Sequence, residues 1–196
     1  MHNRVPTDDN LISRGCSLPS MCSNCNKKAE SSSHLFFECE FSGNLWNWLI
    51  AILNFPIQFS CLDDVWKLCD RNWSPQCKIV IKSCLVNIIN AIWYRRNQVR
   101  FQNKVIHWKI IINHIISAVY MSGSKTSKAA SPDIREFAIL KSFKINIHPP
   151  KPPIIKEIIW SLPSSTGSKS TPMVQPPRTL LMQQLEVFLE MMQAIV

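Results

Sequence analysis

Apolar residues recur at helical spacing along most of the first 147 positions. Between 41 and 55 they follow the three- and four-residue steps that place side chains on one helix face. Pro56 ends that helix, because proline lacks the amide hydrogen that the next turn needs. Thr7 or Asp8 can cap a short helix that ends at Gly15. The same spacing predicts further helices over 62–70, 75–102, 107–121 and 132–144.

The segment 75–102 is the longest of these predicted helices. Pro75 suits a first turn, where its missing N–H is not needed. Two neighbouring apolar stripes indicate burial on most sides of the early part of this helix, and its last third is polar and basic. β-Branched residues are abundant over 105–119, so a strand is an alternative to a helix there. As a whole, the pattern predicts a mainly α protein.

Two groups of residues are predicted to build the core. Free cysteines among apolar neighbours behave as small hydrophobes, which assigns Cys61, Cys69, Cys77 and Cys84 to the interior. The inward stripes of the shorter helices are formed by Leu45, Trp46, Leu49, Ile52, Leu53, Val65, Trp66, Phe137, Leu140 and Phe143.

Charge is unevenly distributed along the chain. There are 22 Lys and Arg against 13 Asp and Glu, which gives a net charge of +9. From Arg71 to Pro132 there are ten basic residues and no acidic one, so this segment carries +10 and the remainder is about neutral. A field of one sign favours polyanions such as RNA or DNA, although the same cations also suit a solvated helix face. The candidate nucleic-acid contacts are Arg95, Arg96, Arg100, Lys104 and Lys109.

From the sequence we expect neither a membrane-spanning segment nor a secretion signal. The sequence has no run of about 18 uninterrupted apolar residues, which a spanning helix needs, and residues 1–6 lack the apolar centre of a signal peptide. We therefore expect an intracellular protein, in the nucleus or cytoplasm, and not a secreted one. In a reducing compartment, eight cysteines indicate metal binding or packing rather than disulfides.

Four potential metal ligands stand at the spacing C-x2-C-x8-H-x4-C, formed by Cys22, Cys25, His34 and Cys39. The first pair can hold one ion through a tight turn, and the second pair can complete a tetrahedron. Three thiolates and one imidazole make a closed site, which suits one structural zinc ion and leaves no position open for catalysis. A chance cluster of thiols is the alternative, and Cys16 is a rival ligand six residues upstream.

Zinc bound to three thiolates and a neutral imidazole has a net charge of −1. Lys27 and Lys28 lie beside the first cysteine pair and would offset that charge. His107 and His114 have no carboxylate neighbours in the sequence, so we do not expect them to bind metal.

Residues 3–48 resemble the zinc-binding domain of plant non-LTR retrotransposon reverse transcriptases. The resemblance rests on R-V-P-T at 4–7, C-S-N-C at 22–25, Glu30, H-L-F-F-E-C at 34–39 and F-S with L-W at 41–46. It implies ligand roles for Cys22, Cys25, His34 and Cys39 and one structural zinc ion. Further on, I-W-Y-R-R-N at 92–97 resembles the connector of such elements, and the proline-rich segment 152–160 resembles the lead into their ribonuclease H domain.

The expected ribonuclease H start does not follow this lead. When each codon is re-read from its third base, the codons permitted for 168–175 spell K-V-N-T-D-G-A, and those for 182–193 permit A-A-A-G-G-V-F-R-D-D-A. Both strings resemble the opening strands of a retroelement ribonuclease H. We therefore infer a frameshift between Trp160 and Gly167, after which the chain would be an unrelated tail. No metal-binding Asp is left there, since the acids after Lys151 are Glu157, Glu186 and Glu190.

The sequence thus predicts three parts: a reverse transcriptase zinc-binding module over 1–60, a basic helical connector over 61–147, and a disordered Pro/Ser-rich tail over 148–196. The predicted function is that of a retrotransposon-derived zinc-binding fragment that binds RNA or DNA and is not an enzyme. One alternative is an inert pseudogene product, and another is a helical protein-interaction module that uses residues 180–196.

Overall fold

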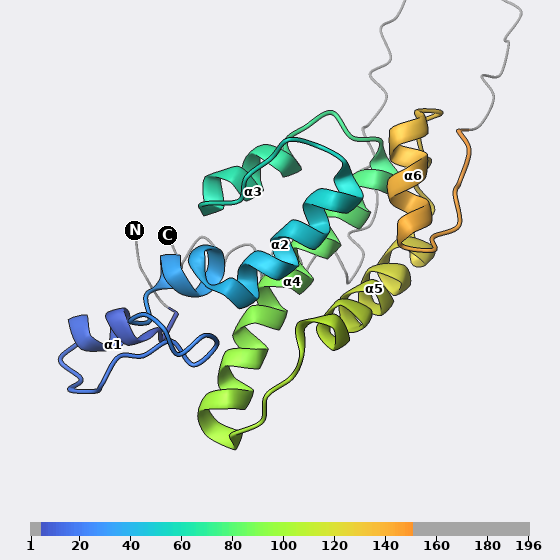
Figure 1. The fold of residues 1–196 in the computed structure, drawn as a ribbon. Helices are drawn as coiled ribbons and strands as arrows, with labels where there is room; N and C mark the ends of the chain where they lie inside the picture. The colour runs from blue at the N-terminus through green and yellow to red at the C-terminus, as the bar shows by residue number, and fades with distance from the viewer. Residues whose placement is uncertain (1–4, 151–196) are drawn as a thin grey trace, which may run out of the picture.

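The structure, a computed structural model, describes residues 5–150 (Figure 1). Over these residues the chain is helical and contains no β-strand, so the predicted mainly α class is confirmed. In chain order, the elements are α1 (Asp8–Ser13), the π-helical turn η1 (His34–Glu38), α2 (Glu40–Leu53), α3 (Leu62–Cys69), α4 (Pro75–Gln102), α5 (Trp108–Lys125) and α6 (Ile134–Ser142).

Helix α4 begins and ends at the predicted residues. The Ser74 side chain accepts a hydrogen bond from the Cys77 N–H, which caps the first turn around Pro75. Asn103 ends the helix in the left-handed conformation, with φ of 50°, which asparagine tolerates better than most residues. Local capping chemistry therefore sets both ends of the longest helix.

Residues 105–119 do not form a strand. They contain a short connection and most of α5, which lies along α4 (Figure 1). The buried residues of α5 stand three and four positions apart, which is helical rather than strand spacing. Packing against α4 therefore outweighs the β-propensity of the isoleucines. The buried apolar residues of α5 are Ile111, Ile112, Ile115 and Val119.

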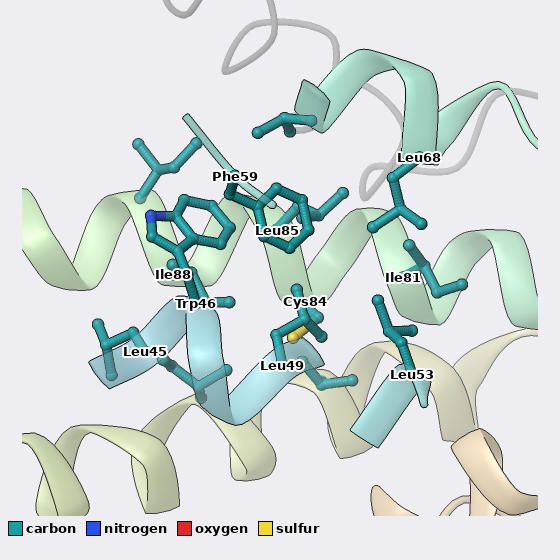
Figure 2. Close-up of a cluster of buried hydrophobic side chains, with 14 of the residues drawn as sticks. Leu45, Trp46, Leu49, Leu53, Phe59, Leu68, Ile81, Cys84, Leu85 and Ile88 are labelled. Atoms are coloured by element: carbon teal, nitrogen blue, oxygen red, sulfur yellow. The ribbon is translucent and has the colours of Figure 1, made fainter. Parts of the chain in front are cut away.

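The core lies between α2 and α4, with α3 covering one side (Figure 2). Cys69, Cys77 and Cys84 are buried as predicted. The cluster in Figure 2 includes Leu45, Trp46, Leu49 and Leu53 from α2, Phe59 and Leu68 around α3, and Ile81, Cys84, Leu85 and Ile88 from α4.

Two predicted core residues are exposed. Cys61 is the N-cap of α3, where the neighbouring Asp64 carboxylate accepts hydrogen bonds from the backbone and hydroxyl of Ser60. Phe137 is 48% exposed. The adjacent Glu136 is buried instead, because its carboxylate accepts from both the backbone N–H and the hydroxyl of Ser74. Glu136 therefore takes an inner position on α6 beside Leu140 and Phe143, which are buried as predicted.

By length and composition alone, α4 could cross a membrane. Half of its apolar window is buried inside the protein, where α2, α3, α5 and α6 pack against it. Helix α4 is therefore surrounded by other helices, as the central helix of a helical core is. The predicted tail beyond Pro150, including the frameshifted segment and the helix over 180–196, lies outside the described residues.

Candidate metal centre

A tight turn brings the first two ligands together. The N–H groups of Cys25 and Asn26 both donate to the Cys22 carbonyl, at 3.3 and 2.8 Å, and the Cys22 N–H donates to the Lys28 carbonyl at 2.8 Å. Asn26 has φ of 52°, which lets the chain reverse after Cys25. Two side chains three residues apart are thereby placed on the same side of the loop.

The second pair comes from a π-helical turn rather than an α-helix. In η1, the Cys39 N–H donates to the His34 carbonyl at 2.7 Å, five residues back. A π-turn is a rare local widening of a helix that often occurs at functional sites. Because one such turn joins the two residues, the imidazole and the thiol reach the same point, and α2 then starts directly after Cys39.

The four side chains converge. Their ligand atoms all lie within 4.8 Å of one another, with Cys22 Sγ 3.8 Å from Cys39 Sγ and Cys25 Sγ 3.3 Å from His34 Nε2. Ideal tetrahedral bond lengths to zinc would place two sulfurs about 3.8 Å apart, and a sulfur and a nitrogen about 3.5 Å apart. The cluster therefore fits a single zinc ion, as predicted.

Burial makes this a closed centre. Cys22, His34 and Cys39 are buried and Cys25 is half-buried. Cys16, the rival ligand, is exposed and is not part of the cluster. All four positions of a tetrahedron are filled by protein side chains, so the bound ion would support the fold and leave no position for a substrate.

Two of the sulfurs already share a hydrogen bond at the position where the ion would bind. The Cys22 thiol donates to Cys39 Sγ, and this hydrogen bond raises the pKa of Cys22 and lowers the pKa of Cys39. A zinc ion would replace the shared proton and allow both to be thiolates.

His34 presents the correct nitrogen. Its Nε2 faces the thiols, whereas its buried Nδ1 has no hydrogen-bond partner among the described residues and lies 3.8 Å from Glu38 Oε2. With Nε2 bound to zinc, the ring proton would be on Nδ1 and would point to this carboxylate. Carboxylates commonly orient zinc-binding histidines in this way.

Arg95 of α4 anchors the first cysteine pair from outside. Its guanidinium donates to the Asn24 carbonyl and to Asn24 Oδ1, at 3.1 and 2.8 Å, and also to the Ile106 carbonyl at 2.9 Å. The same group lies 4.2 Å from the centroid of the Phe41 ring. Because Asn24 stands between Cys22 and Cys25, Arg95 places a buried positive charge against the thiolate-rich turn.

The two lysines that the sequence suggested for charge balance are exposed, and Lys27 lies close enough to Cys25 and Cys39 to interact with their charges. Lys27 forms an exposed ion pair with Glu40 at 2.5 Å, and Lys28 is exposed. The interaction of Arg95 was missed because 71 positions separate it from Asn24. No local spacing reveals such a contact.

A buried ion-pair network fixes the N-terminal segment to α4. Arg96 Nη2 binds Glu30 Oε1 at 2.6 Å and Asp8 Oδ1 at 3.4 Å, and Arg100 binds Asp8 as well. Arg96, Glu30 and Asp8 are 2%, 1% and 0% exposed. Two carboxylates from the segment before η1 are thus neutralised by two guanidinium groups of α4.

The five candidate nucleic-acid residues are therefore divided. The guanidinium groups of Arg95 and Arg96 are buried and engaged by protein groups, and Arg100 is half-buried against Asp8. Lys104 and Lys109 are exposed. The contact of these five residues with phosphates stays a prediction.

Replacing Arg95 with methionine should weaken zinc binding. Loss of an outer interaction around a metal site typically reduces metal affinity about 10- to 100-fold, and here it would also leave Asn24 unsupported. Competition with a chromophoric chelator would measure the change in the full-length protein. Lys104→Met, which removes an exposed charge, is the control and should bind zinc normally. Equal zinc affinity in Arg95→Met and the unmodified protein would contradict this role.

Comparison with known proteins agrees with the geometry of the centre. Residues 1–46 match the family model described as zinc-binding in reverse transcriptase. The match contains all four converging ligands, so the N-terminal segment is similar to a reverse transcriptase zinc-binding domain, and its ligands form a site for one zinc ion. The match ends within α2, before Arg95 and Arg96. No curated protein and no solved structure matches the chain.

Proposed function

We propose that this chain is a zinc-binding fragment derived from a plant non-LTR retrotransposon, and that it binds RNA or DNA without catalysing a reaction. The observation that carries the proposal is the Cys3His cluster within residues that match a reverse transcriptase zinc-binding family. In this proposal the zinc ion is structural, and the basic connector binds the RNA or DNA.

The distribution of charge supports nucleic-acid binding. The acid-free span from Arg71 to Pro132 still carries exposed cations after Arg95 and Arg96 are set aside. The exposed lysines of this span are Lys104, Lys109, Lys125 and Lys128. Among the described residues, none of these four lysines takes part in an ion pair within 4 Å, so their charge is available to a polyanion.

The absence of catalysis is proposed on chemical grounds. Two-metal nuclease chemistry needs several carboxylates that converge on open metal positions. In the described range, the group of potential metal ligands is the closed Cys3His cluster. The buried carboxylates Asp8, Glu30 and Glu136 are engaged by arginines or by Ser74. Cleavage of an RNA–DNA hybrid by the purified protein with Mg2+ would refute this part of the proposal.

Reversing two lysine charges should weaken nucleic-acid binding. In Lys104→Glu/Lys109→Glu, affinity for RNA or DNA should fall, and the slope of log K against log salt concentration should decrease by about two, since each phosphate contact contributes about one. Fluorescence anisotropy at several salt concentrations would measure both.

The matched control is Lys141→Glu/Lys144→Glu. It makes the same change in net charge on exposed lysines at the end of α6, which lies away from the connection between α4 and α5 (Figure 1). The control should retain most of the affinity. If both double variants lose equal affinity, binding depends on net charge rather than on this surface, and if the unmodified protein does not bind at low salt, the proposal fails.

The two alternatives have less support. An inert pseudogene product predicts no binding at low salt and no detectable transcript. A protein-interaction helix over 180–196 lies outside the described residues, and a pulldown lost on deletion of 178–196 would favour it.

A further inference from the structure

The connection between α4 and α5 combines exposed aromatic and basic side chains. Within nine residues, this connection and the adjoining helix ends carry Phe101, Lys104, His107, Trp108 and Lys109, which we call the aromatic–basic turn. Phe101 is 73% exposed, Lys104, His107 and Lys109 are exposed, and Trp108 is half-buried. Figure 1 shows this connection at the lower end of α4, farthest from α3 and α6. The turn is therefore accessible.

The backbone of this turn is held at both ends. After Phe101, the N–H groups of Asn103 and Lys104 donate to the carbonyls of Val99 and Gln98, at 3.2 and 3.1 Å. At the start of α5, His107 Nδ1 accepts from the Lys109 N–H at 3.2 Å. The aromatic side chains are thus mounted on a fixed backbone, so less ordering is needed when a ligand binds.

The zinc-binding loop supports the same turn. Arg95 donates simultaneously to Asn24, between the first two zinc ligands, and to the Ile106 carbonyl inside the turn. One buried guanidinium therefore joins the metal centre to the exposed connection. Through Arg95, the loop that the zinc ion would hold is connected to the backbone of the aromatic–basic turn.

Aromatic and cationic groups are paired within the turn. Lys109 Nζ lies 5.7 Å from the centroid of the Trp108 ring, and the His107 ring is stacked on Trp108 at 5.7 Å. No acidic residue occurs between Arg71 and Pro132 to repel a phosphate. Exposed rings beside cations can stack on unpaired bases while the cations contact the backbone. Bases inside a duplex are already stacked on each other and offer no such surface.

We propose that the aromatic–basic turn is a binding site for single-stranded nucleic acid, in which Phe101 and Trp108 stack on bases and Lys104 and Lys109 contact phosphates. This inference rests on the nucleic-acid binding proposed above and adds strand selectivity and a location to it. An anionic membrane surface is the competing partner, because Val105 and Ile110 beside these residues are also exposed. The acid-free charge and the stacked rings favour nucleic acid.

The test uses the full-length zinc-loaded protein with a labelled single strand and a hairpin duplex of the same composition. Phe101→Ala should lower affinity for the single strand roughly 5- to 150-fold, the range for loss of one base stack, and should leave duplex affinity unchanged. Phe101→Trp should retain binding, because it keeps a ring. Phe137→Ala, an exposed aromatic residue on α6, is the matched control and should behave as the unmodified protein.

The outcomes separate the two proposals. If the unmodified protein binds neither probe, nucleic-acid binding itself is wrong and the stacking site falls with it. If it binds both probes equally, or if Phe101→Ala binds the single strand normally, only the stacking site is overturned. Binding to phosphatidylserine vesicles that depends on Phe101, without binding to the single strand, would overturn it in favour of a membrane.

Discussion

Replacing Arg96 with methionine is expected to destabilise the protein by about 3–5 kcal/mol, which is the usual cost of removing one partner from a buried ion pair. The methionine would fill much of the same space, but Glu30 would be left buried without its main partner, whose Nη2 now lies 2.6 Å from Glu30 Oε1. Equilibrium denaturation followed by circular dichroism, at a fixed zinc concentration, would measure the difference in the free energy of unfolding.

Two further variants separate charge from packing at this position. Arg96→Met/Glu30→Gln should recover part of the loss, because it removes the unpaired carboxylate as well. Arg100→Met should cost less than Arg96→Met, since the Arg100 side chain is 25% exposed and that of Arg96 is 3% exposed. If Arg96→Met unfolds at the same denaturant concentration as the unmodified protein, the network does not hold the N-terminal segment on α4.

Replacing His34 with alanine is expected to disturb the N-terminal segment more than replacing Arg96 with methionine. Structural zinc in small Cys/His domains binds with an apparent free energy of about 10–16 kcal/mol, which is available to folding. Losing one of four ligands should sharply weaken zinc binding and expose the loop from Cys22 to Cys39. The core between α2 and α4 contains many buried apolar side chains that do not touch the metal, so it should remain folded.

Hydrogen exchange would locate this change. The Cys39 N–H, which donates to the His34 carbonyl at 2.7 Å, and the Asn26 N–H, which donates to the Cys22 carbonyl at 2.8 Å, should lose protection in His34→Ala. His34→Cys, which offers a fourth thiolate, should keep zinc and most of the protection. Unchanged protection at both amides in His34→Ala would show that the loop folds without the metal.

The sequence was sufficient for the parts of the structure that depend on local order. Helix α4 could be delimited because Pro75 acts on its own turn and the apolar spacing runs along a single helix. The four zinc ligands could be named because their spacing is short. The π-helical form of η1 was not predicted, although the five-residue step from His34 to Cys39 is the signal that would have indicated it.

The parts that escaped prediction depend on contacts between distant residues. Arg95 and Arg96 stand in an acid-free stretch, which predicts contact with nucleic acid. Their protein partners Asn24, Glu30 and Asp8 lie far back in the chain, where no local pattern links them to α4. Glu136 is buried on α6 because Ser74, 62 positions earlier, satisfies its carboxylate. Spacing within one helix cannot report such pairs.

Zinc content, measured by mass spectrometry on the purified full-length protein, is the most direct test of the central claim that Cys22, Cys25, His34 and Cys39 hold one structural ion. We predict one zinc per chain in the unmodified protein and in Cys16→Ala, because Cys16 is exposed and outside the cluster. We predict that Cys39→Ala will lose the metal. A zinc-free protein, or a Cys39→Ala variant that retains a full equivalent of zinc, would contradict the account.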